Sequence, residues 1–320
     1  MKTLKVSVVQ MTCLDGQVDT NLNHASQLTL EATKNGAELV LFPEFMSQGY
    51  HLTTEIWNSA EPFNGPTTRW LCATAKELNV YVGSSFLEAS KGHFLNTFAM
   101  ADPSGKIIGV VRKRFPSMWE AYFFKGLPGK NTFDTDFGPV GVGICFDNHT
   151  HIVASILAAS NPVLILMPHS YCTPTLQNKM TSQADIDRLN SLPGHVAHIY
   201  NSLFGVPILM CNKSGSWDSP VPNKLLGTPN NYIFSGRSII LDADGTTIVE
   251  LGTKESIGFG QVTLNPELKK KSPVPKHSRY IYPGPPGREI IRFMEWRGKL
   301  SYAFNKLRKQ KALLAEQNSQ

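Results

Sequence analysis

The stretch VGVGICFDN, residues 140–148, decides how the rest of the chain is interpreted. Its residues before the cysteine are small or branched and apolar, which is typical of a strand covered on both faces. Cys145 comes directly after them, where a strand would give way to a loop or a helix. Cys145 is therefore either a small core residue that carries a thiol or the nucleophile of an enzyme.

Short β-rich runs recur along the chain, and helical patterns separate some of them. Several runs are continuously apolar, which suits strands with both faces covered. Helical patterns are expected over 20–35, ending at Gly36, and over 66–79, 148–160 and 182–204. Turn signals such as DPSG and DADG join other strands into hairpins. This mixture predicts two packed sheets with helices outside them.

The composition is that of an ordinary globular protein, with 41% hydrophobic and 18% charged residues. The N-terminal apolar run has only the length of a strand, so no signal peptide is expected. The longest apolar segment is interrupted by Asn161 and Pro162, which argues against a membrane span. Five scattered cysteines do not fit a disulfide framework, and we expect a cytoplasmic protein.

Three polar residues follow predicted strands: Glu44 after ELVLFP, Lys113 at the end of IIGVVRK, and Cys145. Because ligands bind at the carboxyl ends of strands in open α/β sheets, these side chains are expected to meet. A base such as Glu44 would remove the thiol proton of Cys145. Lys113 and the backbone N–H of Phe146 would stabilise the oxyanion. The three residues suffice for acyl transfer from an amide or a nitrile.

With these residues in order, the chain resembles the nitrilase superfamily of carbon–nitrogen hydrolases over about residues 4–265. The resemblance implies a four-layer α-β-β-α sandwich. It also implies that Glu44 is the general base, Lys113 the stabilising cation and Cys145 the nucleophile. Glu120 matches the family's second glutamate, which orients the lysine or assists proton transfer. The motifs that carry the resemblance are VVQM, LVLFPEFMSQGY, NTFAMADPSGKIIGVVRK, SMWEAYFF, VGVGICFDN and SGRSIILDADGTTI.

The sequence after the nucleophile bears on the substrate. The nitrile-hydrolysing branch typically has Cys-Trp-Glu-Asn and many amidases have Cys-Tyr-Asp, whereas this chain has Cys-Phe-Asp-Asn. Asp147 favours hydrolysis of a small amide or N-carbamoyl compound, while Asn148 and the short step from Lys113 to Glu120 fit a nitrilase. A catalytically silent binding or scaffold protein is the alternative from another class. The expected substrate-binding residues are Tyr50, Trp119, Phe146, His149, His169 and Cys172.

Metal binding is the main rival to covalent catalysis. Cys145, His149 and His151 form a Cys-x3-His-x-His run, and zinc sites use such residues. On a helix that begins near residue 148, however, the two histidines would point about 200° apart. We therefore expect no metal and no cofactor.

The charge of the chain is concentrated near its C-terminal end. Residues 269–320 hold 13 of the 31 Lys and Arg residues and 3 of the 25 acidic residues, a net charge of +10. The resemblance divides the chain into a carbon–nitrogen hydrolase domain, 1–268, and this basic extension, 269–320. The extension is expected to be an extended segment followed by a helix with an apolar face.

Relatives of this family often use such an extension to contact another subunit. We therefore expect a homodimer or larger homo-oligomer, with the extension at the interface. A basic segment also fits nucleic acid or an anionic membrane. Because no nucleic-acid-binding motif is present, we expect a small-molecule substrate and neither of those partners.

Overall fold

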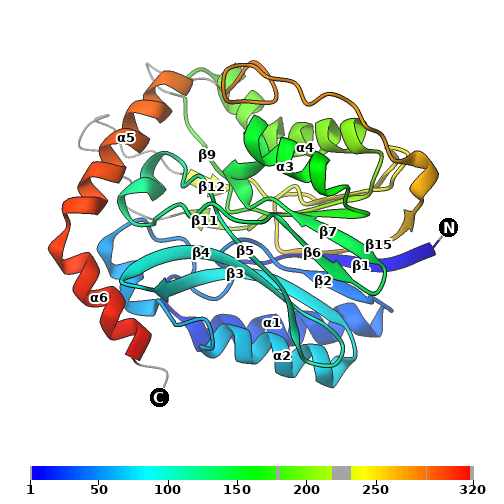
Figure 1. Cartoon of the computed structure of the whole chain (residues 1–320), viewed down its shortest axis with the longest axis horizontal. Helices are drawn as coiled ribbons and strands as arrows, with labels where there is room; N and C mark the ends of the chain where they lie inside the picture. Colours follow the sequence, from blue (N-terminus) through cyan, green and yellow to red (C-terminus); the bar gives the residue numbers. More distant parts are fainter. Residues whose placement is uncertain (1, 178–180, 218–231, 286, 318–320) are drawn as a thin grey trace.

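The computed structural model describes residues 2–177, 181–217, 232–285 and 287–317. It consists of two six-stranded sheets packed face to face, with helices outside them (Figure 1). The first sheet has the order β15 (Ser256–Leu264), β1 (Lys2–Gln10), β2 (Leu39–Leu41), β3 (Tyr81–Ser90), β4 (His93–Ala101) and β5 (Ile107–Arg112). The second has the order β14 (Thr247–Glu250), β13 (Ile239–Leu241), β10 (Ile208–Cys211), β8 (Leu164–Pro168), β7 (Gly138–Val142) and β6 (Thr132–Thr135).

Four helices complete the outer layers (Figure 1). Helices α1 (Val18–Lys34) and α2 (Pro66–Leu78) cover the first sheet, and α3 (His151–Ser160) and α4 (Gln183–Phe204) cover the second. The predicted α-β-β-α sandwich is thus confirmed. A small sheet of β11 (Ser216–Trp217), β12 (Tyr232–Phe234) and β9 (Cys172–Pro174) accompanies the two large ones.

Strand periodicity explains why both sheets are buried on both faces. Successive side chains of a strand point to opposite faces. In β1, Val8 packs into the core between the sheets, whereas Val9 packs under the outer helices. Val142 and Leu166 of the second sheet are also part of the inter-sheet core, and the side chains of Val8, Val9, Val142 and Leu166 are all fully buried. This core fixes the distance between the two sheets.

The helix predictions are close to the observed bounds except near the cysteine. The helix predicted from 148 begins instead at His151, because Thr150 is extended and its side chain accepts a hydrogen bond from Val153 N–H. Cys145–His149 forms a separate 3₁₀ helix, η3. The first helix ends with Asn35 as its cap, while Gly36 follows it with a φ of +86°.

The C-terminal extension packs on its own sandwich and contains two helices where the sequence predicted one. Asn305 separates α5 (Arg288–Phe304) from α6 (Lys306–Gln317), and its side chain accepts a hydrogen bond from Arg308 N–H. Helix α5 contacts the 3₁₀ helix η2 (Met118–Tyr122), and α6 contacts β3, β4 and η1 (Thr54–Ser59). The backbone N–H of Phe94 donates to Tyr302 Oη at 2.9 Å. The domain boundary at 268 stays a prediction.

Gly298 allows α5 to approach η2 closely. A Cβ at this position would lie 2.8 Å from the backbone carbonyl carbon of Ala121, which cannot move aside as a flexible side chain can. We expect Gly298→Ala to destabilise the protein by about 1–3 kcal/mol through overpacking. Thermal unfolding should therefore show a Tm lower by several degrees.

The matched control is Gly194→Ala, also in a helix, where an added Cβ meets nothing within 4 Å. Replacing that glycine should raise stability by up to about 1 kcal/mol, because alanine is the better helix former. An equal rise in Tm for both variants would contradict close packing of α5 against η2.

Candidate active site

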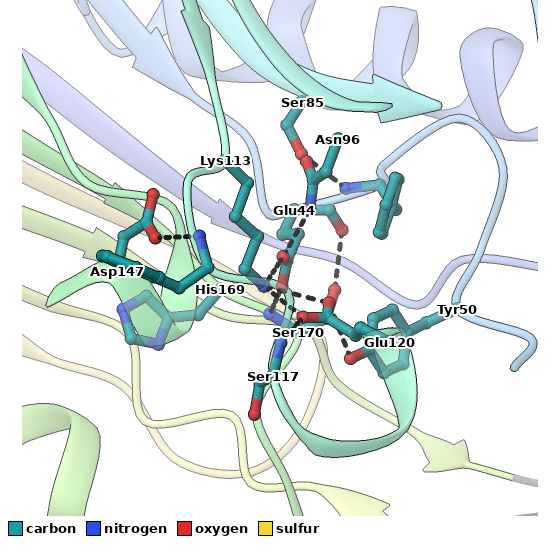
Figure 2. A network of polar contacts seen from close by, with 12 residues as sticks. Glu44, Tyr50, Ser85, Asn96, Lys113, Ser117, Glu120, Asp147, His169 and Ser170 are labelled. Atoms are coloured by element: carbon teal, nitrogen blue, oxygen red, sulfur yellow. Dashed lines mark hydrogen bonds and ion pairs between the residues drawn. The ribbon is translucent and has the colours of Figure 1, made fainter. Parts of the chain in front are cut away.

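Three catalytic candidates come from the ends of strands in both sheets. Glu44 follows β2, Lys113 directly follows β5, and Cys145 opens η3 a few residues after β7. Figure 2 shows the Glu44 and Lys113 side chains pointing toward one another, with Glu120 of η2 beside them. Cys145 is also buried, with 7% of its surface exposed. The structure therefore brings together residues that are far apart in the sequence.

Lys113 lies between two carboxylates. Its Nζ donates to Glu44 Oε1 at 2.7 Å and to Glu120 Oε1 and Oε2 at 2.9 and 2.7 Å. Each of the three side chains is at most 1% exposed. Burial would lower the pKa of Lys113, but the charges of Glu120 and Glu44 outweigh it and raise the pKa well above its usual value. Lys113 is therefore a permanent buried cation.

Glu120 titrates near neutrality. Burial, its largest influence, raises its pKa to about 7, the charge of Glu44 acts in the same direction, and Lys113 opposes both. Tyr50 Oη donates to Glu120 Oε1 at 3.0 Å, and Ser117 N–H donates to Oε2 at 2.6 Å. These bonds fix the carboxylate, which in turn holds Lys113.

Glu44 is fixed by residues that the sequence did not single out. Asn96 Nδ2 donates to Glu44 Oε1 at 2.7 Å, and Ser170 N–H donates to Oε2 at 2.8 Å. Ser170 follows β8, so its position at a strand end was an available signal, whereas Asn96 lies within β4 and its only signal was the motif that leads to Lys113. The predicted pocket residue His169 accepts a hydrogen bond from Glu44 N–H through its backbone carbonyl at 3.2 Å.

The residue after Glu44 is held in a strained conformation. Phe45 has a φ of +49°, which costs a non-glycine residue about 1–2 kcal/mol. Its N–H donates to Ser85 Oγ at 2.9 Å, and its carbonyl accepts a hydrogen bond from Lys213 Nζ at 3.0 Å. Lys213 is fully buried, and burial lowers its pKa. It follows β10, so the strand-end argument would have identified it as well.

Cys145 also has a left-handed backbone, with a φ of +48°. Burial raises the pKa of its thiol well above the usual value, and Glu44 raises it further, while Lys113 and a hydrogen bond from Ser170 N–H lower it. The thiol is therefore protonated at neutral pH. Formation of a thiolate requires a nearby base at the moment of reaction.

Asp147 ties the helix that carries Cys145 to the loop after Lys113. Its carboxylate accepts hydrogen bonds from Arg114 N–H at 3.0 Å and from Phe115 N–H at 2.9 Å. Burial raises the pKa of Asp147 to about 6 despite these donors. This residue, which the sequence associated with amidases, here holds two backbone segments together.

The predicted pocket residues fall into two groups. Tyr50 packs in an aromatic cluster that includes Trp119 and the partly buried Cys172. Phe146 packs instead with residues of the C-terminal extension. His149 Nδ1 lies 2.7 Å from Tyr282 Oη, also in the extension. Contact of these residues with a substrate stays a prediction.

The buried histidines are neutral. Burial, assisted by nearby positive charge, lowers the pKa of His149 to about 3 and that of His169 well below its usual value. Within the described ranges, no group of three or more His, Cys, Asp or Glu side chains could hold a metal ion. The Cys-x3-His-x-His run accordingly does not form such a group.

The chain matches the model of the carbon-nitrogen hydrolase family over residues 5–267, and it belongs to this family. Omega-amidase NIT2 of Mus musculus is 26% identical over 87% of this chain and 96% of its own length. The nitrilase of Pyrococcus abyssi is 33% identical over 57% of this chain and 70% of its own length. The carbon-nitrogen hydrolase structure from Helicobacter pylori G27, 18% identical, covers 98% of this chain and 99% of its own, with a TM-score of 0.71.

The protein is thus a carbon–nitrogen hydrolase of the nitrilase superfamily, as its motifs implied. The similarity to the Helicobacter pylori structure supports the fold of the sandwich and of the C-terminal extension. Of the helices that the structure describes, none has the length and apolar character needed to cross a membrane.

Tyr50 offers a test of the Glu120 environment. Its hydroxyl stabilises the ionised carboxylate, so Tyr50→Phe should raise the pKa of Glu120 above about 7. If ionised Glu120 is needed to hold Lys113, activity rises with pH through this pKa. The acid limb of the kcat/KM profile should then move to higher pH by up to about one unit.

Tyr122→Phe, which removes a hydroxyl from η2 itself, is the matched control and should leave the limb in place. An acid limb that stays fixed in Tyr50→Phe, or that moves to lower pH, would show that Glu120 does not govern it.

Proposed function

We propose that the protein hydrolyses the carbon–nitrogen bond of a small amide or N-carbamoyl compound through a thioester on Cys145. The observation that carries this proposal is the buried cluster in which Lys113 bonds both Glu44 and Glu120 close to the thiol. The amide preference is supported by the mouse omega-amidase, whose similarity extends over 87% of the chain. The Pyrococcus nitrilase supports nitrile hydrolysis as the second candidate.

In the proposed first half-reaction, Glu44 accepts the thiol proton while Cys145 sulfur attacks the carbonyl carbon. Lys113 and the backbone N–H of Phe146 stabilise the negative charge that develops on the carbonyl oxygen. The tetrahedral intermediate then collapses, the carbon–nitrogen bond breaks, and Glu44 returns the proton to the departing nitrogen. Ammonia or an amine leaves, and the acyl group remains on sulfur.

In the second half-reaction, Glu44 accepts a proton from water as the water attacks the thioester carbon. The carbon–sulfur bond breaks, the acid is released, and the thiol regains a proton from Glu44. Glu120 holds Lys113 throughout, through the two hydrogen bonds that join them. Each proton taken up by Glu44 is returned, so no external acid or base is consumed.

Cys145→Ala should abolish turnover and leave the Tm nearly unchanged, because the substitution removes the nucleophile and little volume. Glu44→Gln and Lys113→Ala should each lower kcat by at least about 10³-fold, since members of one catalytic unit are not additive. Ammonia release at saturating substrate is the measurement. Cys72→Ala, a partly exposed thiol on α2, is the control and should retain activity. Turnover by Cys145→Ala would refute the mechanism.

The substrate class requires a panel of small aliphatic and aromatic amides, N-carbamoyl compounds and nitriles. Ammonia should be released from members of the amide or N-carbamoyl sets, and acid quenching should trap an acyl group on Cys145 that is detectable by mass spectrometry. Release from nitriles alone would establish the nitrilase alternative. An intact protein that turns over none of these and forms no adduct would favour the silent binding or scaffold alternative.

The proposal includes a homo-oligomer that forms through the outer face of α5 and α6. Eight large apolar side chains on these helices are exposed by 42–81% of their surface, and an exposed patch of this kind is typical of an interface. They are Ile290, Phe293, Trp296, Leu300, Phe304, Leu307, Leu313 and Leu314. The proposal also includes a location in the cytoplasm. All five cysteines are free, which favours a reducing compartment.

Light scattering should give a mass of at least two chains for the wild-type protein. The double variant Trp296→Glu, Phe304→Glu should shift the mass toward one chain, because buried unpaired carboxylates oppose association. Leu14→Glu, at an exposed apolar residue outside α5 and α6, is the control. A wild-type monomer at micromolar concentration would contradict the proposal.

A further inference from the structure

The segment around Arg279 is hydrogen-bonded to the chain just after the nucleophile helix η3. His151 N–H donates to Arg279 O at 2.8 Å, and Ile281 N–H donates to His149 O at 3.1 Å. Tyr282 Oη adds the contact to His149 Nδ1 at 2.7 Å. The extension is therefore joined to the last residue of η3 by both backbone and side chain.

The Arg279 side chain reaches the residue next to the nucleophile. Its guanidinium carbon lies 4.9 Å from the centroid of the Phe146 ring, which is within the range of a cation–π contact. Two parallel hydrogen bonds of 2.6 and 2.7 Å join the same guanidinium to Glu295 of α5. Glu295 is only 5% exposed, so it depends on this partner.

Helix α5 connects two parts of the active site. Through Glu295 and Arg279 it reaches Phe146 in η3, the helix that Cys145 opens. It also packs against η2, the helix that contains Glu120, with Gly298 close to Ala121. The extension thus lies against both η2 and η3.

We propose that Arg279 is a positioning residue that holds the backbone at Phe146, and hence Cys145, in the reactive geometry. This inference rests on the proposed role of Cys145. The left-handed φ of Cys145 persists only if its surroundings hold it, and the ring of Phe146 is clamped by a guanidinium that is itself fixed by Glu295. The clamp also fixes the direction of the Phe146 N–H, the proposed oxyanion donor.

The test compares Arg279→Ala and Glu295→Gln with Arg292→Ala, which removes a mostly exposed arginine from α5, the helix that contains Glu295. The measurements are kcat, KM, Tm and the rate at which iodoacetamide alkylates Cys145. We expect kcat to fall by about 100-fold in Arg279→Ala with little change in KM, because small displacements of reacting groups have effects of this size. Alkylation should slow as well, and Arg292→Ala should match the wild type.

Two further measurements separate positioning from a general loss of structure. Methylguanidinium added to Arg279→Ala should restore part of kcat, because it can occupy the space between Phe146 and Glu295. If Arg279→Ala does not fold, Arg279→Lys takes its place. It keeps the charge but loses the paired hydrogen bonds, and kcat should still fall at least about tenfold.

The inference is overturned if folded Arg279→Ala or Arg279→Lys keeps kcat within about twofold of the wild type while Cys145→Ala is inert. It is also overturned if kcat falls only in proportion to the unfolded fraction and methylguanidinium restores none of it. Turnover by Cys145→Ala is a different result, because it refutes the proposed function itself.

Discussion

A buried lysine held between two buried glutamates is the interaction on which the site depends. Lys113 bonds both carboxylates at 2.7–2.9 Å, and loss of one partner from such a buried pair typically costs about 3–5 kcal/mol. Because Glu44 follows β2 and Glu120 lies in η2, the same contacts join a sheet to a connecting loop. Further hydrogen bonds are donated to Glu44 by Asn96 and Ser170, and to Glu120 by Tyr50 and Ser117.

Two residues of the site have left-handed backbones, and each is held from more than one side. Phe45, next to Glu44, is fixed by Ser85 and Lys213. Cys145 opens a short helix whose Asp147 binds the backbone after Lys113. Since such conformations cost about 1–3 kcal/mol each, the surrounding packing must stabilise the folded chain by at least that amount. The inter-sheet core does so by fixing the strands from which both residues emerge.

The sequence predicted the residues whose signal is local. Glu44, Lys113 and Cys145 each follow an apolar run, so strand periodicity locates them before any contact is known. The residues that hold them lie far away in the chain: Ser170 is 126 positions from Glu44, and Lys213 is 168 positions from Phe45. No local pattern encodes such pairs. The late start of α3 was missed for a different reason, because Thr150 suits both a loop and a helix cap.

The charge balance of the site explains why a thiol with a raised pKa is compatible with catalysis. Glu44 and Glu120 both oppose ionisation of Cys145, so a free thiolate beside two carboxylates would be unfavourable. In the proposed mechanism, transfer of the thiol proton to Glu44 forms one negative charge and removes another, and the net charge around Lys113 does not change. The proposed attack on the substrate then moves negative charge from sulfur to the carbonyl oxygen, where Lys113 is placed to stabilise it. The proposed reaction needs a base that removes the thiol proton and a cation that stabilises the oxyanion. Glu44 and Lys113 would supply both, whereas a lowered thiol pKa alone would supply only a thiolate.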